Sequence, residues 1–124
     1  MRILFPLALA TALLAAPGAG RDRNAVPAAV PAGKPQSCIP IRGIRESLVR
    51  NDRVIDFRMN GRRYYRVTLD QPCPQLGLER RFSYATSLSR LCAQDIITVL
   101  QSAPLMRGAS CGLAPFQPVT LAKR

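Results

Sequence analysis

The stretch FRMNGRRYYRV (residues 57–67) gathers side chains that are well suited to hold an anion. Guanidinium groups bind phosphate through forked hydrogen bonds, and an aromatic ring between them can stack on a ligand. The side chains expected on one outer face of a hairpin are Arg58, Arg62, Tyr64 and Arg66. They predict a surface for an anionic ligand. The alternative is a solvated face, whose charges protect the strands from unwanted pairing.

Carboxylates offer a second chemistry, because a glycosidase needs two carboxyl groups on either side of a cleft. The acids of the predicted domain are Glu46, Asp52, Asp56, Asp70, Glu79 and Asp95. A small hydrolase of envelope polymers that uses such acids is therefore the alternative function. Asp56 lies among the arginines, so we expect it to pair with one of them. Asp95 precedes an apolar run and is expected to cap the preceding turn or to pair with Arg90.

The chain contains no histidine. This absence excludes Ser-His-Asp and Cys-His catalysis, as well as zinc sites built on imidazole. The segment GASCG (residues 108–112) fits the G-x-S-x-G pattern. A nucleophile elbow, however, needs a strand-to-helix turn in a large α/β sheet and a histidine downstream. The acids are not clustered as in a calcium-binding loop, so we expect no catalytic residue, no metal site and no cofactor.

The cysteines of the chain are Cys38, Cys73, Cys92 and Cys111. An even number of cysteines in a small exported domain predicts two disulfides. No pair has the C-x-x-C spacing, so neither a thioredoxin-type site nor a zinc knuckle is indicated. Four cysteines allow three pairings. We favour Cys38–Cys111, which would join the two ends of the domain, with Cys73–Cys92 nested inside.

The first 20 of the 124 residues have the pattern of a secretory leader. A positive residue, Arg2, precedes an apolar run from Ile3 to Ala16, and small residues follow. This run is short for a bilayer span, which needs about 20 apolar residues. Residues 1–20 therefore predict a signal peptide and a periplasmic or secreted bacterial protein, with an uncleaved signal anchor as the alternative. Residues 21–37 are rich in proline and alanine and predict a flexible linker.

The chain is strongly basic, with a formal net charge of +11. A field of this sign attracts anionic partners. Outside the cytoplasm the expected partners are anionic lipid, lipopolysaccharide or an envelope protein, whereas nucleic acid is not expected. An arginine-rich composition can equally reflect a GC-rich genome, so the charge alone does not establish a partner.

Short apolar runs of period two predict an all-β domain over residues 38–120, followed by a basic tail at 121–124. About six strands are expected, at residues 38–45, 53–59, 62–69, 81–86, 95–100 and 110–119. Pro115 and Pro118 should place the last strand at a sheet edge. The expected fold is a small antiparallel sandwich or barrel, tied by two disulfides.

The hairpin around Asn60-Gly61 poses a question of register, because a slip of one residue exchanges the two faces of a strand. A two-residue loop would place the apolar residues of the first strand on one face of the hairpin and those of the second strand on the other. A three-residue loop with Gly61 in a left-handed conformation places both apolar sets together, and we predict that loop. The outer face would then consist of Val54, Asp56, Arg58, Arg62, Tyr64 and Arg66.

Several segments of the chain resemble those of a known family in order and spacing. They are SCIPIRGIR, RVIDFRMNGRRYYRVTL, QPCPQLGLERRFSY, LCAQDIITVL and ASCGLAPFQPV. The chain resembles a group of small exported proteobacterial proteins known as a domain of unknown function (family 6491). The resemblance covers about residues 37–120. It implies export and a compact β domain tied by cysteines, and it implies no catalytic residue.

Overall fold

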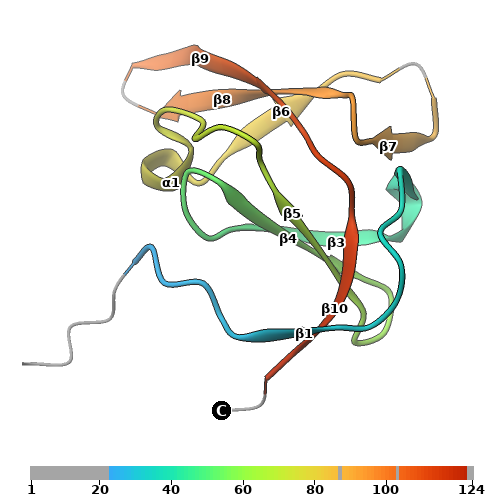
Figure 1. Cartoon of the computed structure of the whole chain (residues 1–124). Helices are drawn as coiled ribbons and strands as arrows, with labels where there is room; N and C mark the ends of the chain where they lie inside the picture. The colour runs from blue at the N-terminus through green and yellow to red at the C-terminus, as the bar shows by residue number, and fades with distance from the viewer. Residues whose placement is uncertain (1–22, 87, 103, 123–124) are drawn as a thin grey trace, which may run out of the picture.

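The structure is a computed structural model that describes residues 23–86, 88–102 and 104–122 (Figure 1). The predicted signal peptide (1–20) and the last two residues of the basic tail lie outside the described residues. The strands are β1 (Ala29–Pro31), β2 (Cys38–Pro40), β3 (Ile44–Val49), β4 (Val54–Met59), β5 (Tyr64–Thr68), β6 (Phe82–Tyr84), β7 (Arg90–Cys92), β8 (Ile96–Ser102), β9 (Leu105–Gly112) and β10 (Gln117–Leu121). The helical turns are the 3-10 turn η1 (Ile41–Gly43) and α1 (Leu76–Glu79).

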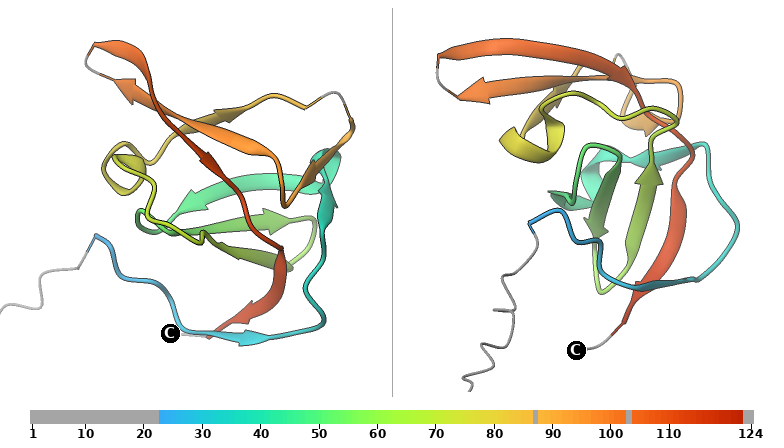
Figure 2. Two further views of the ribbon diagram at one scale, coloured as in Figure 1. Left: turned by 45° about the horizontal axis from the view of Figure 1, so that its top comes forward. Right: turned by 60° about the vertical axis from the view of Figure 1, so that its left-hand side comes forward.

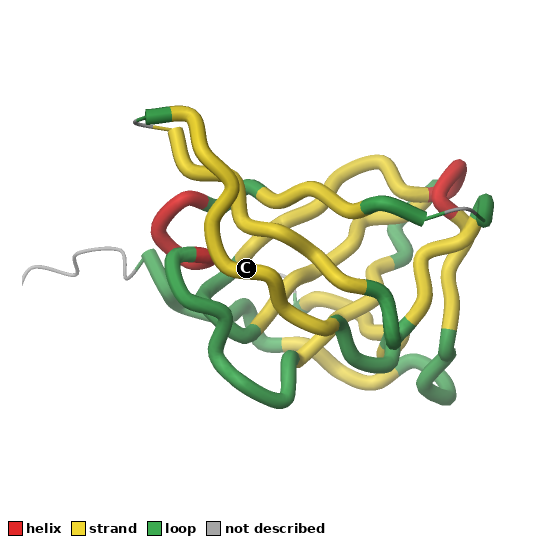
Figure 3. Tube along the Cα trace, turned by 90° about the horizontal axis from the view of Figure 1, so that it is seen from above, coloured by secondary structure: helices red, strands yellow, loops and turns green. Residues whose placement is uncertain are grey.

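The strands form antiparallel sheets that confirm the predicted all-β class. One sheet has five strands in the order β1-β10-β5-β4-β3, a second has three in the order β6-β8-β9, and β2 pairs with β7. The three-stranded sheet lies across the five-stranded one, and the chain passes from β9 into β10 to join them (Figures 1 and 2). Strands make up about half of the described chain, and loops make up most of the rest (Figure 3). About six strands were expected, because three-residue strands such as β1 and β7 are too short to show a period.

The core lies between the two larger sheets. Every second side chain of β4 points to the same face of the sheet, and those on the core side are all buried. They are Ile55, Phe57 and Met59. The ring of Phe57 contacts Phe82 of β6 at 6.3 Å and Phe116, which precedes β10, at 5.7 Å between centroids. The aromatic contacts therefore join both layers and the segment that connects them.

The predicted register of the β4–β5 hairpin is confirmed. The amide of Met59 donates to the carbonyl of Arg63 over 2.8 Å, which closes a three-residue loop, and Gly61 has φ +77°. This left-handed conformation favours glycine because a side chain would clash with the backbone. Arg58 lies opposite Tyr64 on the neighbouring strand. The faces are therefore assigned as the period-two pattern predicted.

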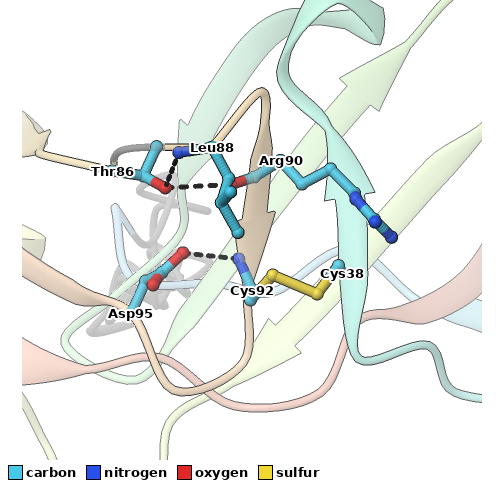
Figure 4. The surroundings of a disulfide bond; sticks show 6 residues. All are labelled: Cys38, Thr86, Leu88, Arg90, Cys92 and Asp95. Carbon is cyan, nitrogen blue, oxygen red and sulfur yellow. Dashed lines mark hydrogen bonds between the residues drawn. A yellow bond between two sulfur atoms is a disulfide. The ribbon is translucent and has the colours of Figure 1, made fainter.

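Both disulfides form, but the predicted pairing is wrong. The bonds are Cys38–Cys92 and Cys73–Cys111. Cys38 and Cys92 are direct partners across β2 and β7, and the amide of Cys92 also donates to Asp95 (Figure 4). The two ends of the domain do meet, but they do so through backbone pairing of Gln36 with Phe116 rather than through a disulfide.

Within the predicted linker (21–37), the structure places a short strand that the sequence did not indicate. Residues 29–31 form β1, which pairs with β10, and flanking backbone bonds join Ala28 to Ala122 and Ala32 to Pro118. Because β1 covers β10, the strand that was expected at a sheet edge lies inside the sheet. An edge strand can pair through its backbone alone, so its sequence needs no apolar alternation.

Candidate anion-binding groove

Asp56 and Arg66 of the predicted outer face lie opposite each other and form a buried ion pair. Asp56 is fully buried, and its carboxylate accepts from Arg66 Nε at 2.8 Å and from Arg50 Nε at 2.9 Å. Arg66 Nη2 also donates to Asp56 and to the carbonyl of Pro27. The expected pairing of Asp56 with an arginine is confirmed. The face is not solvated here, because the N-terminal segment crosses it, and Nε and Nη2 of Arg66 are engaged within the protein.

Arg58 is also paired, in this case at the surface. Its Nε lies 3.2 Å from Glu46 Oε2, and both side chains are well exposed. A pair of this kind contributes little to stability, but it reduces the local positive charge. Of the predicted anion-binding residues, Arg62 and Tyr64 remain, and the structure brings them to a groove.

The groove lies where the β4–β5 loop meets β10 and the segment that follows β1. Its volume is about 240 Å³. Its lining residues are Ala32, Gly33, Lys34, Gln36, Arg62, Arg63, Tyr64, Tyr65, Pro118, Val119 and Thr120. The three cationic side chains are exposed, and none of them pairs with a carboxylate among the described residues. The lining contains no acid, so the groove carries unbalanced positive charge.

The residue types suit a small anion. Forked guanidinium groups and an ammonium group donate charge-assisted hydrogen bonds, and the tyrosine rings can pack against an adjoining group. Pockets for drug-sized ligands have about 300–1,000 Å³. A groove of about 240 Å³ is below that range and suits a headgroup-sized ligand.

Sequence reasoning missed Lys34, Arg63 and Tyr65 as groove residues. Lys34 lies in the predicted linker. Arg63 and Tyr65 occupy positions that period-two alternation assigns to the inner face of the strand. The consecutive pairs Arg62-Arg63 and Tyr64-Tyr65 were the sequence signal that could have indicated these groove residues. Arg62 and Arg63 lie in the loop before β5, where strict alternation does not hold, so both can reach one groove. Tyr64 and Tyr65 lie inside the ladder, and Tyr65, which packs partly against the core, also lines the groove.

A larger cleft of about 600 Å³ lies between Asn24, the β3–β4 turn and α1. Its polar side chains form hydrogen bonds with the backbone of the adjoining loops. Asn51 Oδ1 accepts from the amides of Arg53 and Val54. Asp52 Oδ1 accepts from the amide of Gly77 over 2.7 Å. These bonds explain the shape of the turn without a ligand.

The acids considered for hydrolysis have structural partners. Glu79 accepts from the amide and the hydroxyl of Ser102, and Asp95 Oδ2 accepts from the amide of Cys92 over 2.7 Å. The expected capping role of Asp95 is thus confirmed. Asp52 is the acid that lines the larger cleft, and the groove has none. Neither of these two pockets offers the pair of carboxyl groups that a glycosidase requires.

The G-x-S-x-G segment lies within β9 and not at a strand-to-helix turn. Ser110 is exposed and sits opposite Thr98 of β8, with 3.1 Å between the two hydroxyl oxygens. Ser110 therefore has the environment of a cross-strand hydrogen bond. Within the described ranges, no three histidine, cysteine, aspartate or glutamate side chains form a group that could hold a metal ion.

Comparison with known proteins found no matching family model, curated protein or solved structure. The resemblance to small exported proteobacterial proteins therefore stays an expectation from the sequence. No helix within the described residues is long and apolar enough to cross a membrane.

Proposed function

We propose that this protein is an exported, non-enzymatic binding domain whose basic groove takes a phosphate-bearing anionic group of the cell envelope. One observation carries the proposal: Lys34, Arg62 and Arg63 meet at a groove without a carboxylate. Export is supported by the leader pattern and by the two disulfides, since such bonds persist in oxidising compartments. Anionic lipid and lipopolysaccharide both present phosphate groups of the required chemistry.

The test is partition of the mature protein onto vesicles of phosphatidylglycerol, with phosphatidylcholine vesicles as the neutral comparison. The double variant Arg62→Ser/Arg63→Ser should bind about 30-fold more weakly, because a basic residue near an anionic surface contributes about 1 kcal/mol. The matched control is Arg90→Ser/Arg107→Ser, which removes the same charge from exposed positions outside the groove. The control variant should lose much less vesicle binding, because the charges that it removes lie away from the groove, and salt screens charges over about 8 Å.

An equal loss in both double variants would contradict a specific groove and indicate attraction by net charge alone. No binding of the unaltered protein at low salt would reject the phosphate-lipid proposal. Competition by inorganic phosphate distinguishes two possible ligands that both carry phosphate, namely free phosphate and a lipid headgroup. Displacement at millimolar phosphate would assign the groove to a free phosphate group, whereas its failure would assign it to a headgroup presented on a surface.

A further inference from the structure

The β4–β5 loop carries an asparagine followed by a glycine, and both residues are exposed. The loop lies at one end of the five-stranded sheet (Figure 1). The backbone of Asn60 is fixed there, because its amide donates to the carbonyl of Gly43 over 3.1 Å. Its side chain reaches the surface, where Arg45 Nε donates to Asn60 Oδ1. The carboxamide of Asn60 is therefore held in solvent beside a cation.

The backbone nitrogen of Gly61 is open to reaction. It donates to no acceptor in the described part of the chain. A Cβ atom at Gly61 would meet nothing within 4 Å, so the space beside this residue is open. Glycine also has no side chain that could shield its nitrogen from the preceding carboxamide. An electrophilic carbon, Cγ of Asn60, and an unhindered nitrogen thus lie next to each other in the chain.

The other two asparagines of the chain, Asn24 and Asn51, lack this arrangement. Asn51 precedes Asp52, whose side chain crowds the backbone nitrogen between them. Asn51 Oδ1 also accepts from two backbone amides, which hold its carboxamide within the β3–β4 turn. Asn24 precedes Ala25, whose Cβ atom crowds the nitrogen in the same way. Of the three asparagines, Asn60 is the one whose neighbouring nitrogen belongs to a glycine.

We propose that Asn60 is a site of spontaneous deamidation and that this modification weakens anion binding in the basic groove, the second part resting on the proposed function. In the first step the nitrogen of Gly61 bonds to Cγ of Asn60 and forms a cyclic imide. The side-chain nitrogen of Asn60 leaves as ammonia and carries away the proton of the Gly61 amide. Water then breaks one of the two C–N bonds of the imide, which gives aspartate or isoaspartate at position 60. The reaction needs no oxidant, reductant or second protein.

The product has a negative charge where Asn60 is neutral. Arg45 already contacts the side-chain oxygen and would pair with the new carboxylate, which favours the product. Arg62 and Arg63 follow in the same loop and line the groove. Because consecutive Cα atoms are about 3.8 Å apart, position 60 lies within one screening length, about 8 Å, of the backbone of Arg62. The new charge therefore lowers the positive potential that attracts an anion.

The first experiment incubates the mature protein, with its disulfides intact, at neutral and at mildly alkaline pH. Peptide mapping by mass spectrometry should show aspartyl and isoaspartyl forms at Asn60. They should form faster than any change at Asn24 or Asn51, and faster at the higher pH, because the attacking nitrogen must lose its proton. An unmodified Asn60, or equal rates at all three asparagines, would overturn the site.

Gly61→Ala tests the attacking group. The added methyl group shields the nitrogen, so deamidation of Asn60 should be slower than in the unaltered protein. Gly112→Ala is the matched control, because it makes the same change at another open position outside the loop, and it should leave the rate unchanged. Circular dichroism verifies that both variants are folded. Equal rates of deamidation in the two variants would overturn attack by Gly61.

Asn60→Asp reproduces the aspartyl product and tests its effect on binding. It should bind phosphatidylglycerol vesicles about 5-fold more weakly, which is the effect of one charge near an anionic surface. Asn51→Asp is the matched control, because it adds the same charge outside the groove and its carboxylate can still accept from the amides of the turn. An equal loss in both variants would overturn the effect on the groove. If the unaltered protein binds no vesicles, the proposed function fails, whereas peptide mapping still decides the deamidation site.

Discussion

Asp56 and Glu46 show how burial changes the contribution of an ion pair to stability. Both carboxylates pair with arginine side chains of the same sheet region. Asp56 is fully buried between Arg50 and Arg66, whereas the side chains of Arg58 and Glu46 are 40% and 49% exposed. A buried charge that loses its partner keeps its desolvation cost, and an exposed one regains its hydration.

We expect Asp56→Asn to reduce the free energy of unfolding by about 3–5 kcal/mol, because it leaves two arginines facing a neutral amide. Glu46→Gln is the matched control and should cost less than about 1 kcal/mol. Urea denaturation without reductant measures both values. Equal midpoints for the two variants would contradict the importance of the buried pair.

At the scale of elements, the contact between α1 and the β3–β4 turn depends on the lack of a side chain at Gly77. A Cβ atom there would lie 2.9 Å from Asp52 Oδ1 and 3.0 Å from the amide nitrogen of Asp52. The amide of Gly77 also donates to the same carboxylate. The turn and the helix therefore approach at backbone distance.

Gly77→Ala should lower the free energy of unfolding by about 1–3 kcal/mol, the usual cost of overpacking a close contact. Gly112 provides a comparison within β9, because a Cβ atom there meets nothing within 4 Å. Gly112→Ala should leave stability unchanged or raise it by up to about 1 kcal/mol. A smaller loss at Gly77 than at Gly112 in thermal unfolding would refute this account of the α1 contact.

At the scale of the whole molecule, the disulfides compensate for a small core. The two disulfides close loops whose ends are 54 and 38 residues apart in the sequence. Loop-closure entropy predicts a stabilisation of about 4 kcal/mol from each. Native domains have free energies of unfolding of only about 5–15 kcal/mol, so the two bonds together are comparable to the total.

Reduction is therefore expected to abolish the cooperative thermal transition of the mature protein in circular dichroism. Peptide mapping without reduction should recover cross-linked peptides for Cys38–Cys92 and Cys73–Cys111. If the predicted signal peptide is removed, the intact mass of protein purified from its native compartment and alkylated should show no alkyl groups and a start near residue 19 or 21. A reduced chain that still melts cooperatively would mean that the core is sufficient without its cross-links.

The sequence by itself determined the features that depend on local periodicity and composition. Alternating apolar residues on both sides of Asn60-Gly61 specified the hairpin and its register, since a slip would bury the wrong face. The even number of cysteines indicated two disulfides in a small domain. The absence of histidine removed the common catalytic constellations at once.

Only the tertiary structure decided the features that depend on distant segments. The cysteine pairing followed from β2 lying against β7, a strand too short to show a pattern. Arg66, which binds the buried Asp56, also donates to the carbonyl of Pro27 in the N-terminal segment, whose backbone pairing requires no side-chain signal. The basic groove joined Lys34 to Arg62 and Arg63 for the same reason. Backbone pairing is nearly independent of side-chain type, so the sequence alone did not reveal these contacts.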